Sequence, residues 1–139
     1  MSRENADLVL RGYQAFVAGD LEAVGELLDP DVEWHGLEDE DSGASRDAIG
    51  RILAERFEED YRVELERCVA KGDEVLVSLR ATRAEADPLA DRPLQSRRRF
   101  TIGRFCAVVT VRDQRVVRVQ EYPHVPAALE ALGVDEAHL

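Results

Sequence analysis

Residues 100–122 read FTIGRFCAVVTVRDQRVVRVQEY, a stretch that predicts two β-strands on either side of a turn at Asp113. Apolar and polar residues alternate along both halves, which is the period of a strand with one buried face. In the second strand Val117, Val119 and Glu121 share one face, because side chains alternate across a strand. The face with the valines is expected to be buried. Glu121 therefore lies either at a solvated strand end or in the lining of a cavity.

Two further strands are predicted before this stretch. Tyr61–Ala70 and Glu74–Ala84 alternate with period two and flank a Lys-Gly-Asp turn, so they are expected to pair as a hairpin. Val69 has the same phase as Val63 in this pattern. The segment Glu85–Ser96 contains two prolines and is predicted to be a loop, which makes it a candidate rim or lid.

Helical patterns precede the strands. Apolar residues recur at three- and four-residue steps up to Gly19, a natural left-handed cap, and Asp20 can cap a second helix that is expected to stop at Pro30. A short strand is predicted over Asp31–Leu37, followed by a loop through Ala44 and a third helix. The stripe of that third helix contains Ile49, Ile52, Leu53, Arg56 and Phe57.

The order of these elements predicts an α+β fold. Three helices come first, four long strands follow, and a short closing helix is predicted over residues 126–132. This order indicates an antiparallel sheet with helices on one face. Strands of this length do not stay flat, so the sheet is expected to curl around the helices. The conical space that remains is the concave, apolar kind of site that small ligands prefer.

Composition limits the class of protein. The chain has 139 residues, of which 45% are hydrophobic and 34% charged, as expected for one globular domain. No apolar run is long enough to span a bilayer, and the start MSRENADLVLRGYQ lacks the apolar core of a signal peptide. We therefore expect a cytoplasmic protein with no membrane partner. The formal net charge of −11 repels phosphate backbones and argues against nucleic acid as a partner.

Several runs of residues resemble one known family. They are YQAFVAGDL at 13–21, LLDPDVEW at 27–34, RDQRVV at 112–117, EY at 121–122 and AALEALG at 127–133. Through them the chain resembles the SnoaL-like branch of the nuclear transport factor 2-like superfamily, as a single SnoaL-like domain over residues 1–139. The resemblance implies a cone-shaped, strongly curved antiparallel sheet wrapped around N-terminal helices, the ketosteroid isomerase-like or cystatin-like roll, which usually dimerises through its sheet. The same cone hosts polyketide cyclases, isomerases, epoxide hydrolases and non-catalytic binding domains, so it does not by itself determine the chemistry.

Catalytic residues carry over only in part. Ketosteroid isomerases use an aspartate base, with a tyrosine and a protonated aspartate as oxyanion donors. By the resemblance the base falls at Gly36 and the acidic donor at about Ala107, while Tyr13 lands one position from the isomerase tyrosine. Many SnoaL-like relatives carry a histidine at the position of Ala107. Steroid isomerisation by that mechanism is therefore not expected, and a cyclase assignment is weakened.

The phase of the strands predicts a different polar set around the pocket. Glu121 is the candidate base or acid, because an apolar cavity should raise the pKa of a carboxyl group toward neutrality. Tyr13 can donate a hydrogen bond to a substrate oxygen, or it is a core aromatic with a satisfied hydroxyl. His124 can pair with Glu121 at the pocket mouth, or it is a turn residue with no role. The remaining candidate substrate contacts are Phe16, Trp34, Phe105, Val109 and Val119.

Other reactive residues have simpler interpretations. No metal site is predicted, because the three histidines lack ligand spacing and the acidic loop Glu38–Asp41 lacks the calcium-loop pattern. Cys68 and Cys106 are expected to act as small hydrophobes. The basic run Arg97–Arg99 is interpreted as a solvated strand end screened by acidic neighbours, with capture of an anionic ligand as the alternative. His35 is expected at the surface or an interface, and His138 in a fraying tail.

Two functional hypotheses follow. The first is a small-molecule pocket protein that acts as a cofactor-independent acid/base isomerase, cyclase or hydrolase on a small hydrophobic substrate. The second is a non-catalytic ligand-binding or dimerisation module. A homodimer is expected from the resemblance and from the outward sheet face, which carries Cys106, Val108 and Thr110.

Overall fold

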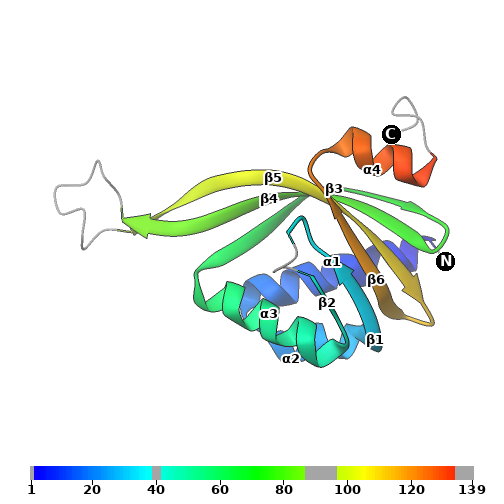
Figure 1. The fold of residues 1–139 in the computed structure, drawn as a ribbon, viewed down its shortest axis with the longest axis horizontal. Coiled ribbons are helices and arrows are strands. Elements are labelled where there is room, and N and C mark those ends of the chain that lie inside the picture. The colour runs from blue at the N-terminus through cyan, green and yellow to red at the C-terminus, as the bar shows by residue number, and fades with distance from the viewer. Residues whose placement is uncertain (1, 39–41, 87–96, 134–139) are drawn as a thin grey trace.

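The computed structural model describes residues 2–38, 42–86 and 97–133 (Figure 1). The helices are α1 (Ser2–Ala18), α2 (Leu21–Leu27), α3 (Arg46–Glu58) and α4 (Val125–Leu132). The strands are β1 (Leu28–His35), β2 (Gly43–Ala44), β3 (Tyr61–Lys71), β4 (Glu74–Ala86), β5 (Arg97–Arg112) and β6 (Arg115–Tyr122). Most of the candidate lid lies outside the described residues. Glu85 and Ala86 are the exceptions, because they belong to β4, which runs further than the sequence pattern suggested.

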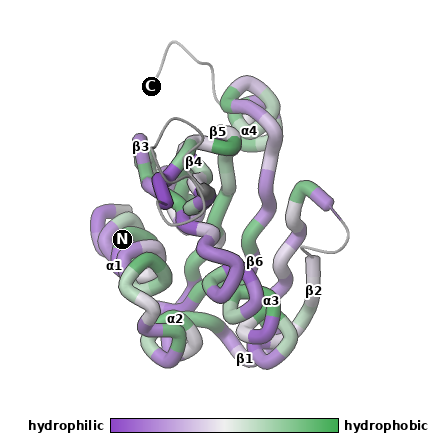
Figure 2. The backbone as a smooth tube through the Cα atoms, turned by 90° about the vertical axis from the view of Figure 1, so that its left-hand side faces the viewer, coloured by the Kyte–Doolittle hydropathy of each residue, from purple (hydrophilic) through white to green (hydrophobic). Residues whose placement is uncertain are grey.

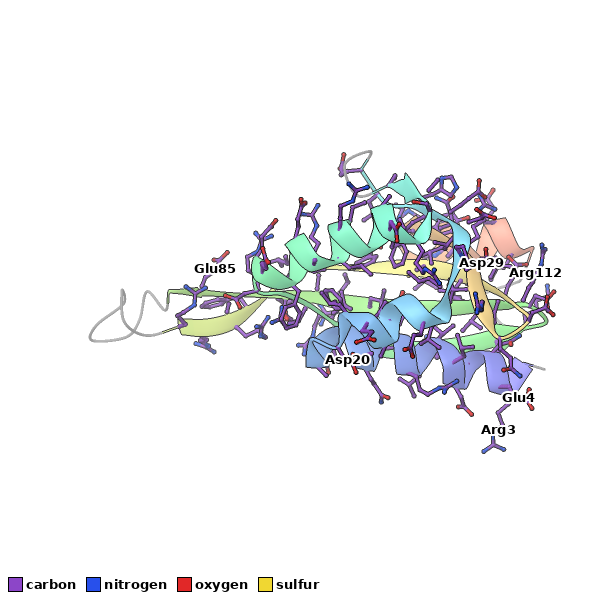
Figure 3. The ribbon with its side chains drawn as sticks, turned by 90° about the horizontal axis from the view of Figure 1, so that it is seen from below. Arg3, Glu4, Asp20, Asp29, Glu85 and Arg112 are labelled. Atoms are coloured by element: carbon purple, nitrogen blue, oxygen red, sulfur yellow. The ribbon has the colours of Figure 1, made fainter. Side chains whose placement is uncertain are left out.

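Local signals set the ends of the helices as expected. Gly19 has a positive φ of 80° after α1, and the Asp20 side chain then accepts a hydrogen bond from the backbone N–H of Ala23 at the start of α2. Ser45 caps α3 in the same way by accepting from Ala48. Pro30 does not end a helix, because α2 stops at Leu27 and Pro30 already belongs to β1. Figure 3, seen from the helix side, shows Asp20 at the junction of α1 and α2.

The strands form one curved sheet in the order β2-β1-β6-β5-β4-β3. Neighbouring strands are antiparallel, as expected, with one exception. β1 runs parallel to β6, with Trp34 opposite Val119 and His35 opposite Gln120. The predicted loop before α3 also contributes the short strand β2 at the sheet edge. β4 and β5 continue together beyond the rest of the sheet as a long arm (Figure 1).

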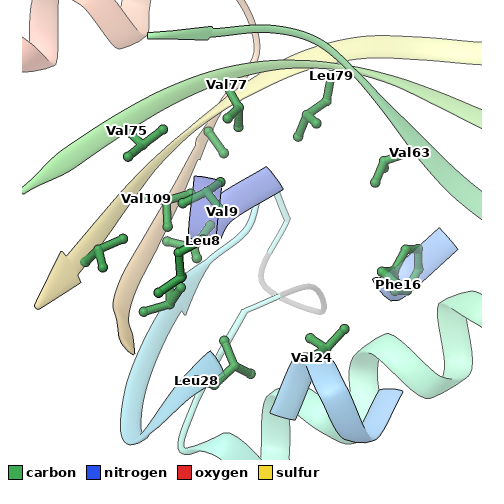
Figure 4. Packing of buried hydrophobic residues seen from close by; sticks show 14 of the residues in the cluster. Leu8, Val9, Phe16, Val24, Leu28, Val63, Val75, Val77, Leu79 and Val109 are labelled. Atoms are coloured by element: carbon green, nitrogen blue, oxygen red, sulfur yellow. The ribbon is translucent and has the colours of Figure 1, made fainter. Parts of the chain in front are cut away.

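The main core lies between the concave face of the sheet and the helices α1 to α3. Val75, Val77 and Leu79 of β4 face Leu8 and Val9 of α1, all of them buried (Figure 4). Burying each such side chain contributes about 1.5–3 kcal/mol to folding. The helices therefore close the concave side and define the space in which a ligand could sit.

α4 packs on the opposite, convex face, which corrects the expectation that all helices cover one face (Figures 1 and 2). Ala128 and Leu129 of α4 form a second buried cluster with Leu76, Cys106 and Val108. α4 thus covers two of the residues, Cys106 and Val108, that suggested a dimer contact. Dimerisation stays a prediction of the resemblance.

Among the β-bulges of the sheet, those in β3 and β6 change the face that later residues occupy, although both strands read as regular in the sequence. In β3 the register slips between Leu65 and Arg67, so Val69 packs in the convex cluster instead of sharing the phase of Val63. In β6 the register slips beside Val116, so Val116 is buried in the main core and Val117 is not. A bulge places two residues opposite one and moves the following side chains to the other face.

Three further features complete the fold. Asp60 binds the basic run at the start of β5: Arg97 donates a hydrogen bond to its carboxylate, and Arg99 donates one to its backbone carbonyl. Of the acidic neighbours that were predicted to screen this run, residues 39–41 lie outside the described residues. Cys106 is buried as expected, but Cys68 is exposed because it lies on the edge strand β3. Within residues 2–38, 42–86 and 97–133, no helix combines the length and apolar character needed to cross a membrane.

Candidate functional site

A cavity of about 420 Å³ lies between the concave sheet and α1 to α3. Its size falls within the range of small-molecule sites, roughly 300–1,000 Å³. Most of the lining is apolar, and the polar groups come from Tyr13, Arg56, Tyr61, Arg83 and Glu121. The apolar lining residues are Leu8, Val9, Gly12, Phe16, Val24, Leu27, Leu28, Trp34, Ile49, Ile52, Leu53, Val63, Phe105, Val109, Val116 and Val119.

The structure brings seven of the eight candidate residues to this cavity. They reach it from α1 (Tyr13 and Phe16), β1 (Trp34), β5 (Phe105 and Val109) and β6 (Val119 and Glu121). His124 is not among the lining residues. Its exposed side chain caps α4, where Nδ1 accepts a hydrogen bond from the backbone N–H of Ala127 at 3.2 Å. The pairing of His124 with Glu121 at the pocket mouth is thus replaced by a helix cap.

Glu121 lies near the end of β6 and is partly buried. Its Oε1 accepts a hydrogen bond from the backbone N–H of Leu37, just beyond β1, at 3.2 Å. Ala107, the position where the resemblance expects a histidine or an acid, is fully buried directly opposite Glu121 in the β5–β6 register. Glu121 therefore supplies the carboxylate of this part of the cavity.

Tyr13 reaches the same cavity from α1. Burial raises the pKa of the Tyr13 phenol well above its usual value, and the nearby charge of Glu121 raises this pKa further. The surface of Tyr13 is only partly buried, and part of it lines the cavity. The phenol of Tyr13 therefore stays protonated across the usual pH range and can donate a hydrogen bond.

This shift predicts a measurable effect on alkaline stability. A group whose folded-state pKa is raised stabilises the fold fully below its unfolded pKa, about 10 for tyrosine, and this contribution is lost as pH rises above that value. Urea midpoints measured between pH 8 and 11.5 should therefore fall more steeply above pH 10 for the wild type than for Tyr13→Phe. Parallel curves for the two proteins would contradict the assignment.

Two arginines that the sequence interpretation did not assign to the site also line the cavity. Arg56 comes from the last turn of α3, and Arg83 lies on β4 opposite Tyr61 of β3. Glu59 is close to both, with N–O distances of 3.4 Å to Arg56 Nη1 and 3.7 Å to Arg83 Nη2. The sequence does contain a signal for these two residues, because each is a charged residue at a position where the pattern predicts a buried apolar one. Arg56 lies in the apolar stripe of α3, and Arg83 shares the phase of the apolar residues before it in β4.

No group of three or more His, Cys, Asp or Glu side chains in the described part of the chain is arranged to hold a metal ion. The polar residues of the cavity are two tyrosines, two arginines and one carboxylate. This set suits proton transfer and hydrogen bonding to oxygen atoms.

A sequence model described as a SnoaL-like domain matches residues 9–119. Among solved structures, Bal32a from a soil-derived mobile gene cassette is 24% identical, with a TM-score of 0.70 over 87% of this chain and 89% of that one. A candidate ketosteroid isomerase from Kribbella flavida is 18% identical, with a TM-score of 0.68 over 89% and 81% of the two chains. TerC, co-crystallised with polyporic acid, is 20% identical, with a TM-score of 0.66 over 94% and 98%. At these identities the structures show a shared fold, and no curated protein matches the chain.

Proposed function

Because the chain belongs to the SnoaL-like domain family, we propose that its cavity binds a small hydrophobic molecule and transfers a proton on it without a cofactor. Glu121 takes the proton and returns it, and Tyr13 donates a hydrogen bond to the substrate oxygen on which negative charge develops. The reaction class is an isomerisation, cyclisation or hydrolysis of a carbonyl, enol or cyclic compound.

The observation that carries the proposal is the meeting of two complementary polar groups in one apolar cavity. Glu121 and Tyr13 both line it, and they are close enough for the charge of Glu121 to raise the pKa of the Tyr13 phenol. A carboxylate beside a protonated phenol supplies both a proton acceptor and a donor for a developing oxyanion. General acid–base catalysis of this kind typically contributes a factor of about 10²–10⁴ in rate.

The solved relatives support a small ligand in such a cone. One of them is a candidate ketosteroid isomerase and another was co-crystallised with polyporic acid. For this chain the support comes from the size of the cavity, about 420 Å³, and from its largely apolar lining.

The second candidate function is ligand binding without chemistry, and one contact favours it. The hydrogen bond from the Leu37 N–H to Glu121 Oε1 gives this carboxylate a structural task, since it ties the segment after β1 to β6. This structural task alone accounts for an acidic residue at position 121, without a role in catalysis. The absence of a polar side chain at Gly36 and Ala107 points the same way.

Deuterium exchange separates the two functions without knowledge of the natural substrate. The purified protein is incubated in D₂O with bicyclic ketones such as 2-decalone and 2-tetralone, and deuterium incorporation next to the carbonyl is followed by NMR. An acid/base enzyme should accelerate exchange above the rate with heat-denatured protein. A ketone that binds the cavity, as seen by ligand-observed NMR, yet exchanges only at the background rate would support the non-catalytic function instead.

A further inference from the structure

We infer that Arg83, with Arg56 beside it, binds an anionic group, a carboxylate or a similar oxyanion, at one end of the molecule that fills the cavity. This inference rests on the proposed function in one respect only, that the cavity binds a small molecule. It adds the substrate class: an elongated amphiphile with an apolar body and one negatively charged end.

The sheet places Arg83 on the cavity side of β4. Val75, Val77, Leu79 and Ala81 are buried in the main core, and Arg83 continues their alternation at the next inward position. Arg56 approaches from α3, and both arginines lie within reach of Glu59. Two guanidinium groups therefore lie beside the single carboxylate of Glu59.

The hydrogen bonds of Arg83 are incomplete. Its Nε is buried and has no hydrogen-bond partner, and its Nη2 is 3.7 Å from Glu59, longer than the roughly 2.7–2.9 Å of a charge-assisted hydrogen bond. A buried donor without a partner is unfavourable, and a rotation of the guanidinium group toward a bound oxyanion would let Nε donate to that group. The planar guanidinium presents Nε and Nη as a fork that matches the two oxygens of a carboxylate.

Arg80 shows that an unpartnered Nε is not sufficient evidence by itself. Its Nε is also buried without a partner, but Arg80 does not line the cavity and its Nη2 is bound to the carboxylate of Glu64. Arg83 combines a donor that has no partner with a place in the cavity wall. Arg80 is therefore the matched control for any test of Arg83.

Glu121 and Arg83 line the cavity from different positions along the sheet, and this separation gives the ligand a direction. Glu121 lies opposite Ala107, which lies opposite Val77, and Arg83 is six residues further along β4, about 20 Å of strand. The long Arg83 side chain shortens this separation. A negatively charged group is repelled by Glu121 and attracted by Arg83, so the neutral, reacting end faces Tyr13 and Glu121. Because the whole chain carries a net charge of −11, the attraction has to be local.

Two fluorescent probes with one aromatic body test this assignment. 1-Anilinonaphthalene-8-sulfonate carries an anionic sulfonate, and N-phenyl-1-naphthylamine is the same ring system without it. Their dissociation constants are measured by fluorescence titration for the wild type, Arg83→Gln and Arg80→Gln. We expect Arg83→Gln to weaken binding of the sulfonate probe about tenfold, the loss of one charge-assisted hydrogen bond, and to change binding of the neutral probe less than twofold. Arg80→Gln should change neither.

A second variant at the same position separates the loss of a specific contact from a general structural effect of the substitution. Arg83→Lys keeps the positive charge but loses the forked geometry of the guanidinium group. It should therefore weaken binding of the sulfonate probe by less than Arg83→Gln does. Equal effects of Arg83→Gln on both probes, or equal effects of Arg80→Gln and Arg83→Gln, would overturn the assignment while leaving the proposed function intact. If neither probe binds the wild type, the assignment fails together with the small-molecule cavity on which the proposed function depends.

Discussion

Glu121→Gln is expected to lower kcat by about 10²- to 10⁴-fold on any substrate that the protein turns over, with little change in KM. The amide has the size and shape of the carboxylate but cannot accept a proton. Steady-state kinetics on a ketone that shows catalysed exchange would measure this loss. Unchanged kcat in the variant would remove Glu121 from the mechanism.

The structural role of Glu121 needs a separate control. The side-chain amide oxygen of Gln can still accept the hydrogen bond from the Leu37 N–H, so Glu121→Gln should unfold at nearly the wild-type urea concentration. Glu121→Ala loses both the proton acceptor and that hydrogen bond, and should be less stable by about 0.5–1.5 kcal/mol. If Glu121→Gln is destabilised as much as Glu121→Ala, its loss of activity cannot be attributed to the chemistry.

Gly19→Ala is expected to destabilise the fold by about 2–5 kcal/mol, the sum of two effects. Gly19 has a φ of +80°, which costs a residue with a Cβ about 1–2 kcal/mol. A Cβ at this position would lie 2.7 Å from Cζ of Phe57, which packs edge-on against Phe16 of the cavity wall. Such overpacking costs roughly 1–3 kcal/mol more. Urea or thermal unfolding monitored by circular dichroism measures the change.

Gly25→Ala is the matched control for Gly19→Ala. Gly25 lies within α2, and a Cβ built there meets nothing within 4 Å. Alanine is favoured over glycine in a helix by about 0.5–1 kcal/mol, so this variant should be slightly more stable than the wild type. If both variants had the same effect, the close approach between Gly19 and Phe57 would not explain the first one.

The end of α1 at Gly19 is an example of a feature that the local sequence predicts correctly. The N–H of Gly19 bonds to the carbonyl of Phe16, and that of Asp20 to the carbonyl of Ala15, which closes α1 in the pattern expected of a glycine cap. The sequence predicted this end, the Asp20 cap and the four long strands, because each depends on residues within a few positions of one another. The same alternation indicated that Val119 and Glu121 share a face, and both line the cavity.

Predictions that depended on an uninterrupted period were wrong where a bulge occurs. Val116, not Val117, enters the core, and Val69 leaves the face of Val63, because one extra residue reverses every later side chain in a strand. A bulge changes neither composition nor hydrophobicity, so the pattern does not reveal it.

The sequence by itself determined the elements of this protein, the apolar face of most of them and the presence of an acid in the phase of a buried valine. These are properties of short segments, which backbone geometry and hydrophobic period specify. Only the tertiary structure decided that β1 runs parallel to β6, that α4 covers the convex face, and that Arg56 and Arg83 meet in one cavity. Those features join residues far apart in the chain, and their position depends on how the curved sheet and the helices pack together.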